Sequence, residues 1–330
     1  MRHHGPVPTD LADLLSTARV FAIPLHTRFR GITVREGVLL DGPAGWSEFA
    51  PFHDYDDAAC VPWLRAAIDS ASRNWPDPVR SRVPVNVTVP VVSPDTAADL
   101  VLRSGCTTAK VKVADVRSDL AADCARVAAV RSALGASGRI RVDANAAWTV
   151  SEAVDAIGAL EAEAAALEYV EQPCRTVDEL AQVRAAVGVP IAADESIRLA
   201  SDPARVALAG AADVAVVKVA PLGGAFAALR VAQTCGLPVV VSSALDTSIG
   251  LAAGLALAGA LPELPYACGL ATASLLTGDV TTRSGLPVDG YLPVPLYAPA
   301  PTPDLLVRWE ANRDTTRFWL DRLHRVASLL

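Results

Sequence analysis

Residues 139–173, RIRVDANAAWTVSEAVDAIGALEAEAAALEYVEQP, contain one complete strand–helix–strand unit. The two ends of this unit are short runs rich in β-branched and apolar residues, Ile140–Asp143 and Tyr169–Glu171. Between them lies the alanine-rich segment Thr149–Leu167, whose apolar residues recur at helical spacing. A helix between two short apolar strands predicts a parallel crossover connection.

The same alternation continues along the chain from Val85 onward. Pro190 and Pro238 each open a strand after a glycine that would end the preceding helix. Strands at intervals of roughly 25 residues match one βα unit each, and eight of them favour a closed parallel (β/α) barrel. An open doubly wound sheet is the alternative, but its Gly-rich phosphate fingerprint after the first strand is missing. The predicted strands are Val85–Val89, Ala109–Val113, Ile140–Asp143, Tyr169–Glu171, Ile191–Asp194, Val214–Val219, Val239–Ser242 and Tyr266–Gly269.

The two ends of the chain differ from this repeat. Residues 1–83 show strand-like alternation around Thr33–Leu40 and a helical segment near Tyr55–Ser72, which is typical of a small α+β domain. The tail is Pro-rich after Ser284 and becomes helical from about Asp304 to Leu323. We expect an α+β domain over residues 1–83, with the tail 285–330 packed back on it, and a barrel over residues 84–284.

The composition limits the class of partner. The chain has 330 residues, 52% of them hydrophobic, which suits parallel strands buried on both faces. Its formal net charge is -7 and it has no basic run, so neither a phosphate backbone nor an anionic membrane surface is an expected partner. A small molecule is the expected partner.

Targeting and cysteine patterns favour a soluble cytoplasmic protein. No signal-type apolar region follows Met1, and the longest apolar run, Ile249–Leu261, is too short to span a bilayer. The six cysteines are scattered without a Cys-x-x-Cys pair, so buried free thiols are expected rather than disulfides. The five histidines are too dispersed to suggest a zinc site.

Charged residues interrupt the apolar strands near their carboxyl ends. Active sites of barrels of this kind are built from residues at those ends. The second strand carries Lys110 and Lys112, and the third ends in Asp143 and Asn145; later strands carry Glu171, Asp194 and Lys218. These positions predict a polar site at one mouth of the barrel.

The lysines are candidates for acid–base chemistry. A period of two puts Lys110 and Lys112 on one face of their strand, with Val111 on the other. Desolvation and mutual repulsion favour a neutral amine, so one of them can act as a base. A solvated pair on an edge strand is the alternative. Lys218, isolated in an apolar strand across the barrel, is costly there unless it is paired or functional.

Three acids are candidates for metal ligands. Asp143, Glu171 and Asp194 come from adjacent strands and would converge if all three point inward. Buried like charges need neutralising, and a hard divalent cation with oxygen ligands achieves this. Each acid taken alone could be an exposed loop residue or a helix N-cap.

Other candidates carry a weaker signal. Ser242 and Ser243 end the seventh strand and could bind a carboxylate or carbonyl, although serines are common there. Gly223 lies in a Gly-Gly pair before a helix whose first amides could hold an anion, or it forms only a turn. Arg30 could close the pocket as part of a lid, or lie in a surface turn.

In their order, these motifs resemble the enolase superfamily, specifically its muconate-lactonizing subgroup. The resemblance implies an enolase-type barrel with an α+β capping domain. It also implies Mg²⁺, with Mn²⁺ as a possible substitute, bound at the positions of Asp143, Glu171 and Asp194, with Lys112 and Lys218 on opposite faces of the substrate. The motifs are Lys110-Val111-Lys112, Asp143-Ala144-Asn145, Glu171-Gln172-Pro173, Asp194-Glu195-Ser196 and Lys218.

Within that subgroup, three stretches resemble the actinobacterial hydro-lyases that form o-succinylbenzoate, a menaquinone precursor, from 2-succinyl-6-hydroxy-2,4-cyclohexadiene-1-carboxylate. They are Arg28–Ile32, Gly45–Phe49 and Ser242–Ser248. The resemblance implies that Lys112 removes a proton and returns it to the departing hydroxyl, helped by Lys110, while Lys218 stabilises charge.

Three other functions are alternatives to this expectation. Dipeptide epimerases carry Asp-x-Asp on the eighth strand, where this chain has Ala267-Cys268-Gly269-Leu270, so the sequence disfavours an epimerase. An N-acylamino acid racemase on the same site, with one lysine on each face, stays open as an alternative. A non-catalytic ligand-binding barrel is a remote one.

Overall fold

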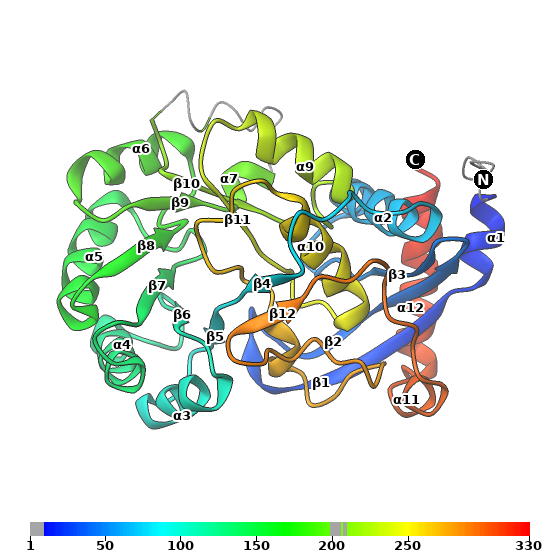
Figure 1. The fold of residues 1–330 in the computed structure, drawn as a ribbon, viewed down its shortest axis with the longest axis horizontal. Helices are drawn as coiled ribbons and strands as arrows, with labels where there is room; N and C mark the ends of the chain where they lie inside the picture. The colour runs from blue at the N-terminus through cyan, green and yellow to red at the C-terminus, as the bar shows by residue number, and fades with distance from the viewer. Residues whose placement is uncertain (1–9, 199–205, 207–209) are drawn as a thin grey trace.

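Seven parallel strands form the central sheet of the computed structural model, which describes residues 10–198, 206 and 210–330 (Figure 1). Neighbouring strands in the sheet follow one another in sequence, so each connection crosses to the next strand along. The strands are β5 (Val87–Val89), β6 (Thr108–Lys112), β7 (Arg139–Asp143), β8 (Leu167–Glu171), β9 (Ile191–Ala193), β10 (Val214–Val217) and β11 (Val239–Val241).

An eighth segment closes the sheet into a barrel. Cys268 forms a parallel bridge with Val85 beside β5, and Gly269 forms one with Ser242 just after β11. The segment therefore joins the first and last strands, which removes both edges of the sheet. The prediction of a closed barrel rather than an open doubly wound sheet is confirmed, because the strand order is consecutive and the eighth predicted strand closes it.

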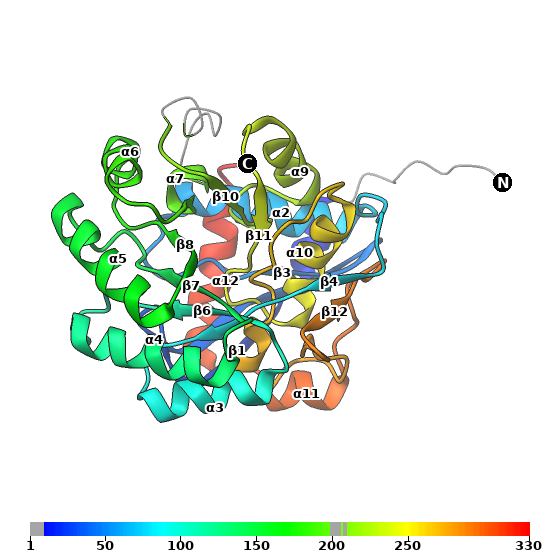
Figure 2. The ribbon, with the colours of Figure 1, turned by 60° about the vertical axis from the view of Figure 1, so that its left-hand side comes forward.

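Helices cover the outside of the strands, as Figures 1 and 2 show. Threonine capping boxes start two of them, because Thr149 and Thr176 each bond the backbone amide of a glutamate three residues later, which bonds back. The helices are α3 (Pro94–Ser104), α4 (Leu120–Leu134), α5 (Val150–Ala164), α6 (Val177–Ala186), α7 (Glu195–Arg198), α9 (Ala225–Thr234) and α10 (Ser248–Ala260). Helix α10 has almost no polar side and is buried nearly throughout.

The N-terminal part is a three-stranded antiparallel sheet with helices. After α1 (Leu11–Ser16), the sheet contains β1 (Arg19–Phe29), β2 (Ile32–Gly42) and β3 (Gly45–Phe49), and α2 (Asp57–Ser72) packs against it. We call this part the cap.

The tail packs back on the cap, but not as a single helix. It contains α11 (Pro303–Arg308) and α12 (Arg313–Ala327), and α12 lies against α2 and β1. The prediction of one helix from Asp304 to Leu323 was wrong, because Glu310 bridges to Phe21 of β1 and Asn312 caps the start of α12. Before them, β12 (Tyr291–Pro293) pairs antiparallel with β4 (Arg82–Pro84), and the 3₁₀ helix η1 (Thr272–Leu275) follows the barrel's eighth segment.

Two further predictions concern cysteines and membranes. All six cysteines are free thiols, and five of them are buried, which confirms the prediction of free thiols over disulfides. No helix in the described ranges has the length and apolar character needed to cross a membrane.

Candidate active site

The predicted catalytic residues meet at the carboxyl ends of the barrel strands. In the sheet register, Asp143 lies between Lys112 on β6 and Glu171 on β8. Lys110, Lys112, Asp143 and Lys218 line one pocket, and Phe29 and Arg30 of the cap line its other side. The turn between β1 and β2 therefore covers the barrel mouth.

The two lysines of β6 face the pocket together but have different partners. Lys110 Nζ lies 3.3 Å and 3.2 Å from the two carboxylate oxygens of Glu171. Lys112 Nζ donates to Asp143 and, at 2.8 Å, to Asn145 Oδ1. Val111 between them is fully buried and does not line the pocket, as the strand period predicts.

These partners separate the pKa values of the two lysines. Burial alone would lower the pKa of Lys110, but Glu171 and Asp143 outweigh it and raise that pKa. Burial lowers the pKa of Lys112, against the attraction of Asp143 and with the help of repulsion from Lys110. Lys112 is therefore the lysine more easily converted to a neutral amine, and Lys110 is held as an ammonium.

The three carboxylates are almost fully buried at adjacent strand ends. Asp143, Glu171 and Asp194 are each about 1% exposed. Burial, together with repulsion from Asp143 and Asp194, raises the pKa of Glu171 to about 7, although Lys110 and Lys218 oppose it. Burial would also raise the pKa of Asp143, but Lys112 and Lys110 hold it below its usual range. Lys218 Nζ lies 2.5 Å from Asp194 Oδ2.

This donor set fits a divalent cation. Across residues 10–198, 206 and 210–330, no group of three or more His, Cys, Asp or Glu side chains is already gathered at metal-binding distance. Each of the three carboxylates is instead paired with a lysine side chain. Carboxylate oxygens are nonetheless the ligands that hard divalent cations prefer, and such a charge would relieve the repulsion that raises the pKa of Glu171. Asp143, Glu171 and Asp194 are the side chains that could hold it.

Gln172 holds the backbone of Asp194 in place, a role that was not predicted from the sequence. Its side chain is fully buried, and its Oε1 accepts hydrogen bonds from the backbone amides of Asp194 at 2.9 Å and Ser196 at 3.2 Å. Its Nε2 donates to Ser196 Oγ at 2.8 Å. The side chain thereby fixes the start of the segment that follows β9. The sequence feature that could have indicated this role is the position of Gln172 directly after Glu171 at a strand end.

The weaker candidates differ in where they lie. Ser242 and Ser243 line the pocket, and Ser243 Oγ contacts Gly269 O at 3.0 Å and Thr272 Oγ1 at 2.7 Å. Arg30 also lines it, with its guanidinium 4.2 Å from the centre of the Phe52 ring.

Gly223 is not brought to this pocket. Its amide donates to the carbonyl of Ala220 at 3.2 Å, and the amide of Gly224 donates to Val219 at 3.1 Å. The Gly-Gly pair thus closes a turn with its own backbone, and Gly223 does not line the pocket.

Family models match both parts of the chain. Residues 94–299 match the enolase C-terminal domain-like family, and residues 20–71 match the enolase N-terminal domain-like family. The first match alone covers more than half of the chain.

Several relatives are similar over most of their length. The o-succinylbenzoate synthase of Thermobifida fusca is 63% identical over 278 residues, which cover 84% of this chain and 87% of that protein. The o-succinylbenzoate synthase of Mycolicibacterium smegmatis is 50% identical over 315 residues, or 95% of this chain and 96% of that protein.

Solved structures share the fold at low identity. The L-Ala-D/L-Glu epimerase of Bacillus subtilis has a TM-score of 0.74 at 24% identity, covering 86% of this chain and 98% of that chain. The muconate lactonizing enzyme of Pseudomonas putida has a TM-score of 0.72 at 20% identity, covering 89% and 98%. These likenesses concern the fold.

Proposed function

The chain belongs to the enolase superfamily and, within it, to the o-succinylbenzoate synthases, and from that premise we propose how its own residues carry out the reaction. The enzyme is a carbon–oxygen lyase that dehydrates 2-succinyl-6-hydroxy-2,4-cyclohexadiene-1-carboxylate to o-succinylbenzoate, a step of menaquinone biosynthesis. The observation that supports the residue assignment is the pocket where Lys112 and Lys218 meet the three buried carboxylates.

Members of this superfamily use a divalent metal, which we propose is Mg²⁺ here, with Mn²⁺ as a substitute. Asp143, Glu171 and Asp194 would hold it. When bound, the cation supplies positive charge that stabilises the negative charge building on the substrate carboxylate as the neighbouring proton leaves.

Lys112 is the proposed base. Its neutral amine takes the proton from the ring carbon that bears the carboxylate, and the resulting ammonium gives that proton to the hydroxyl leaving from the same face. One C–H and one C–O bond break, water departs and the ring becomes aromatic. The lowered pKa of Lys112 supports the first step, and Lys110, held as an ammonium by Glu171, keeps that pKa low.

Lys218 is proposed to stabilise charge from the other face of the ring. Its ammonium lies against Asp194 and lines the same pocket as Lys112. A cation close to the face of a ring that gains negative charge stabilises the transition state more than the ground state.

Replacing Lys218 by alanine is therefore expected to lower kcat roughly 100-fold while KM changes only a few-fold, because the interaction strengthens in the transition state. Steady-state kinetics measure both constants. Lys218→Arg, which keeps a cation at this position, is the matched control and should retain more of kcat. An effect of Lys218→Ala confined to KM would make Lys218 a binding residue only.

We propose that the remaining pocket residues bind substrate. Asn145, Ser242, Ser243 and Arg30 present polar groups to the pocket. Gly223 is not among them, because its amide donates a hydrogen bond within its own turn.

The domain division and the location are proposals as well. We propose that residues 1–83, with 285–330 packed on them, form a capping domain over the barrel of residues 84–284. The contacts of α12 with α2 and β1 support this division. We also propose a cytoplasmic location, which the free thiols of all six cysteines support, and a small carboxylate as the partner rather than nucleic acid or a membrane.

The purified protein is expected to aromatise the cyclohexadiene substrate with Mg²⁺ and to lose this activity in EDTA, because three buried carboxylates lose their counter-charge. A spectrophotometric assay follows the reaction, and added Mg²⁺ should restore it. Thermal melting in EDTA checks that the fold survives. Folded, metal-bound protein without turnover would contradict the assigned reaction.

A further inference from the structure

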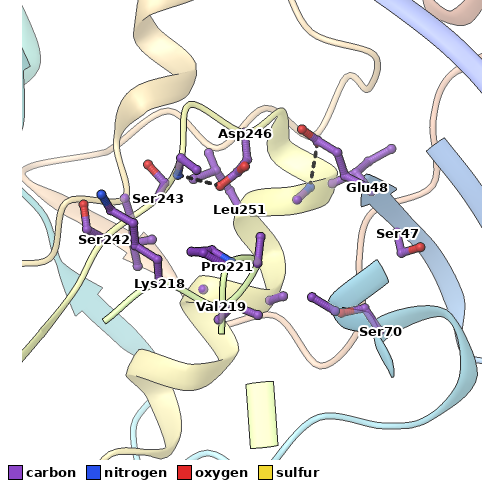
Figure 3. A pocket seen from close by; sticks show the side chains of 18 residues that line it. Ser47, Glu48, Ser70, Lys218, Val219, Pro221, Ser242, Ser243, Asp246 and Leu251 are labelled. Atoms are coloured by element: carbon purple, nitrogen blue, oxygen red, sulfur yellow. Dashed lines mark hydrogen bonds between the residues drawn. The ribbon is translucent and has the colours of Figure 1, made fainter. Parts of the chain in front are cut away.

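Three charged residues lie where the cap meets the barrel: Arg35 and Glu48 are buried, and the side chain of Asp246 is 13% exposed. Arg35 comes from β2, Glu48 from β3, and Asp246 from the loop between β11 and α10. We call residues 242–247 the β11–α10 loop. Glu48 and Asp246 line a small hollow that also contacts Lys218 (Figure 3).

Glu48 reaches from the cap to the start of α10. Its carboxylate accepts hydrogen bonds from Thr247 N at 3.0 Å, Thr247 Oγ1 at 2.5 Å and Gly250 N at 3.2 Å. A side-chain carbon at Gly250 would lie 2.8 Å from Glu48 Oε2, so the close approach depends on a glycine there. These contacts join residues about 200 positions apart in the chain.

Arg35 and Asp246 hold the middle of the same loop. Arg35 Nε donates to the carbonyl of Leu245 at 2.9 Å, and Asp246 Oδ2 accepts from the amide of Ala244 at 3.0 Å. Leu245, which lies between Ala244 and Asp246 in the chain, has φ 66°, a left-handed conformation that is unfavourable for leucine. The loop is therefore kept in a strained course by contacts on both sides of Leu245.

The strained loop forms a wall of the active-site pocket. Ser242, Ser243, Ala244 and Leu245 line the pocket that contains Lys112 and Lys218. The cap thus reaches the substrate site in two ways, directly through Phe29 and Arg30 and indirectly through the loop that Glu48 and Arg35 hold.

A role in helix capping alone does not account for Glu48. Thr247 already caps α10, because its Oγ1 accepts a hydrogen bond from Ile249 N at 3.3 Å. A buried carboxylate is also a costly group: burial and Asp246 raise the pKa of Glu48 to about 8, against the attraction of Arg35. The extra carboxylate is better explained by what it holds in place.

We propose that Glu48 is a positioning residue for the dehydration, which fixes the β11–α10 loop from the cap and so sets the fit of the substrate in the pocket. The proposal rests on the synthase function. It assigns to the cap a contribution to substrate binding that does not involve contact between Glu48 and the substrate.

Glu48→Ala is expected to raise KM about tenfold and to weaken binding of the product o-succinylbenzoate by a similar factor, with kcat within about threefold of wild type. The reason is that Lys112 and Lys218 stay in place, while the loop wall contributes to ground-state and transition-state binding alike. Steady-state kinetics and calorimetric titration with o-succinylbenzoate measure these quantities. Wild-type turnover in the same assay tests the synthase function separately.

Asp279→Ala is the matched control. Asp279 is also a buried acid that contacts the start of α10, because it accepts hydrogen bonds from Ser248 Oγ and, at 3.4 Å, from Ser248 N. It does not line the active-site pocket. The Asp279→Ala substitution should lower the melting temperature while leaving KM and product affinity near wild type.

Two results would overturn the proposal. One is unchanged KM and product affinity in Glu48→Ala. The other is an equal rise in KM in Asp279→Ala, which would mean that Glu48 contributes only to the stability of the helix. Should Glu48→Ala not fold, Thr247→Val removes one contact of the same carboxylate. It must then weaken product binding in the same direction, and unchanged affinity would count against the proposal.

Discussion

Lys112→Ala is expected to lower kcat by roughly four orders of magnitude or more, because the same amine removes the proton and returns it to the leaving hydroxyl. Its position supports so large an effect. Lys112 shares the pocket with Lys218, hydrogen-bonds Asp143 and Asn145, and has a pKa that burial and Lys110 lower. Stopped or quenched assays over hours would measure the residual rate.

Lys112→Arg is the control that separates charge from proton transfer. Arginine keeps a cation beside Asp143 but does not give up its proton at accessible pH. It should be about as inactive as the alanine variant, and both variants should still bind Mg²⁺ in calorimetry. Substantial activity in either variant would remove Lys112 as the base.

Glu171→Gln is expected to weaken Mg²⁺ binding by at least about 100-fold and to lower turnover at limiting metal, because it removes one of three anionic ligands from a buried site. The change also leaves Lys110 without its closest carboxylate partner, at 3.2 Å. The positive charge of Lys110 then stays near the cation with no carboxylate of Glu171 to offset it. Isothermal titration of the metal-free protein with Mg²⁺ measures the affinity directly.

Glu168→Gln on the same strand is its matched control. Glu168 pairs with Arg141 at 2.5 Å and does not line the active-site pocket. Its loss is expected to lower stability, since Arg141 is fully buried, but not the affinity for Mg²⁺. Equal metal affinities for wild type and Glu171→Gln would take Glu171 off the list of ligands.

The sequence predicted the barrel well because each strand carries its own local signal. Short apolar runs, helical spacing between them and a glycine before Pro190 or Pro238 depend only on neighbouring residues. The eighth strand was predicted from such a run although, in the fold, Cys268 and Gly269 make only isolated bridges. The tail was predicted to be helical from Asp304 to Leu323 without a break, because the break at Glu310 arises from pairing with the distant Phe21.

By itself, the sequence determined the strands, and which charged residues stand at their carboxyl ends, because a period of two and burial fix where a side chain on a strand points. Only the tertiary structure decided which partner each lysine takes. Lys110 pairs with Glu171 and Lys112 with Asp143 because the register of β6, β7 and β8 sets these distances, and that pairing separates two otherwise equivalent amines. The contact of Glu48 with Thr247 likewise depends on how the cap packs on α10, which no local pattern encodes.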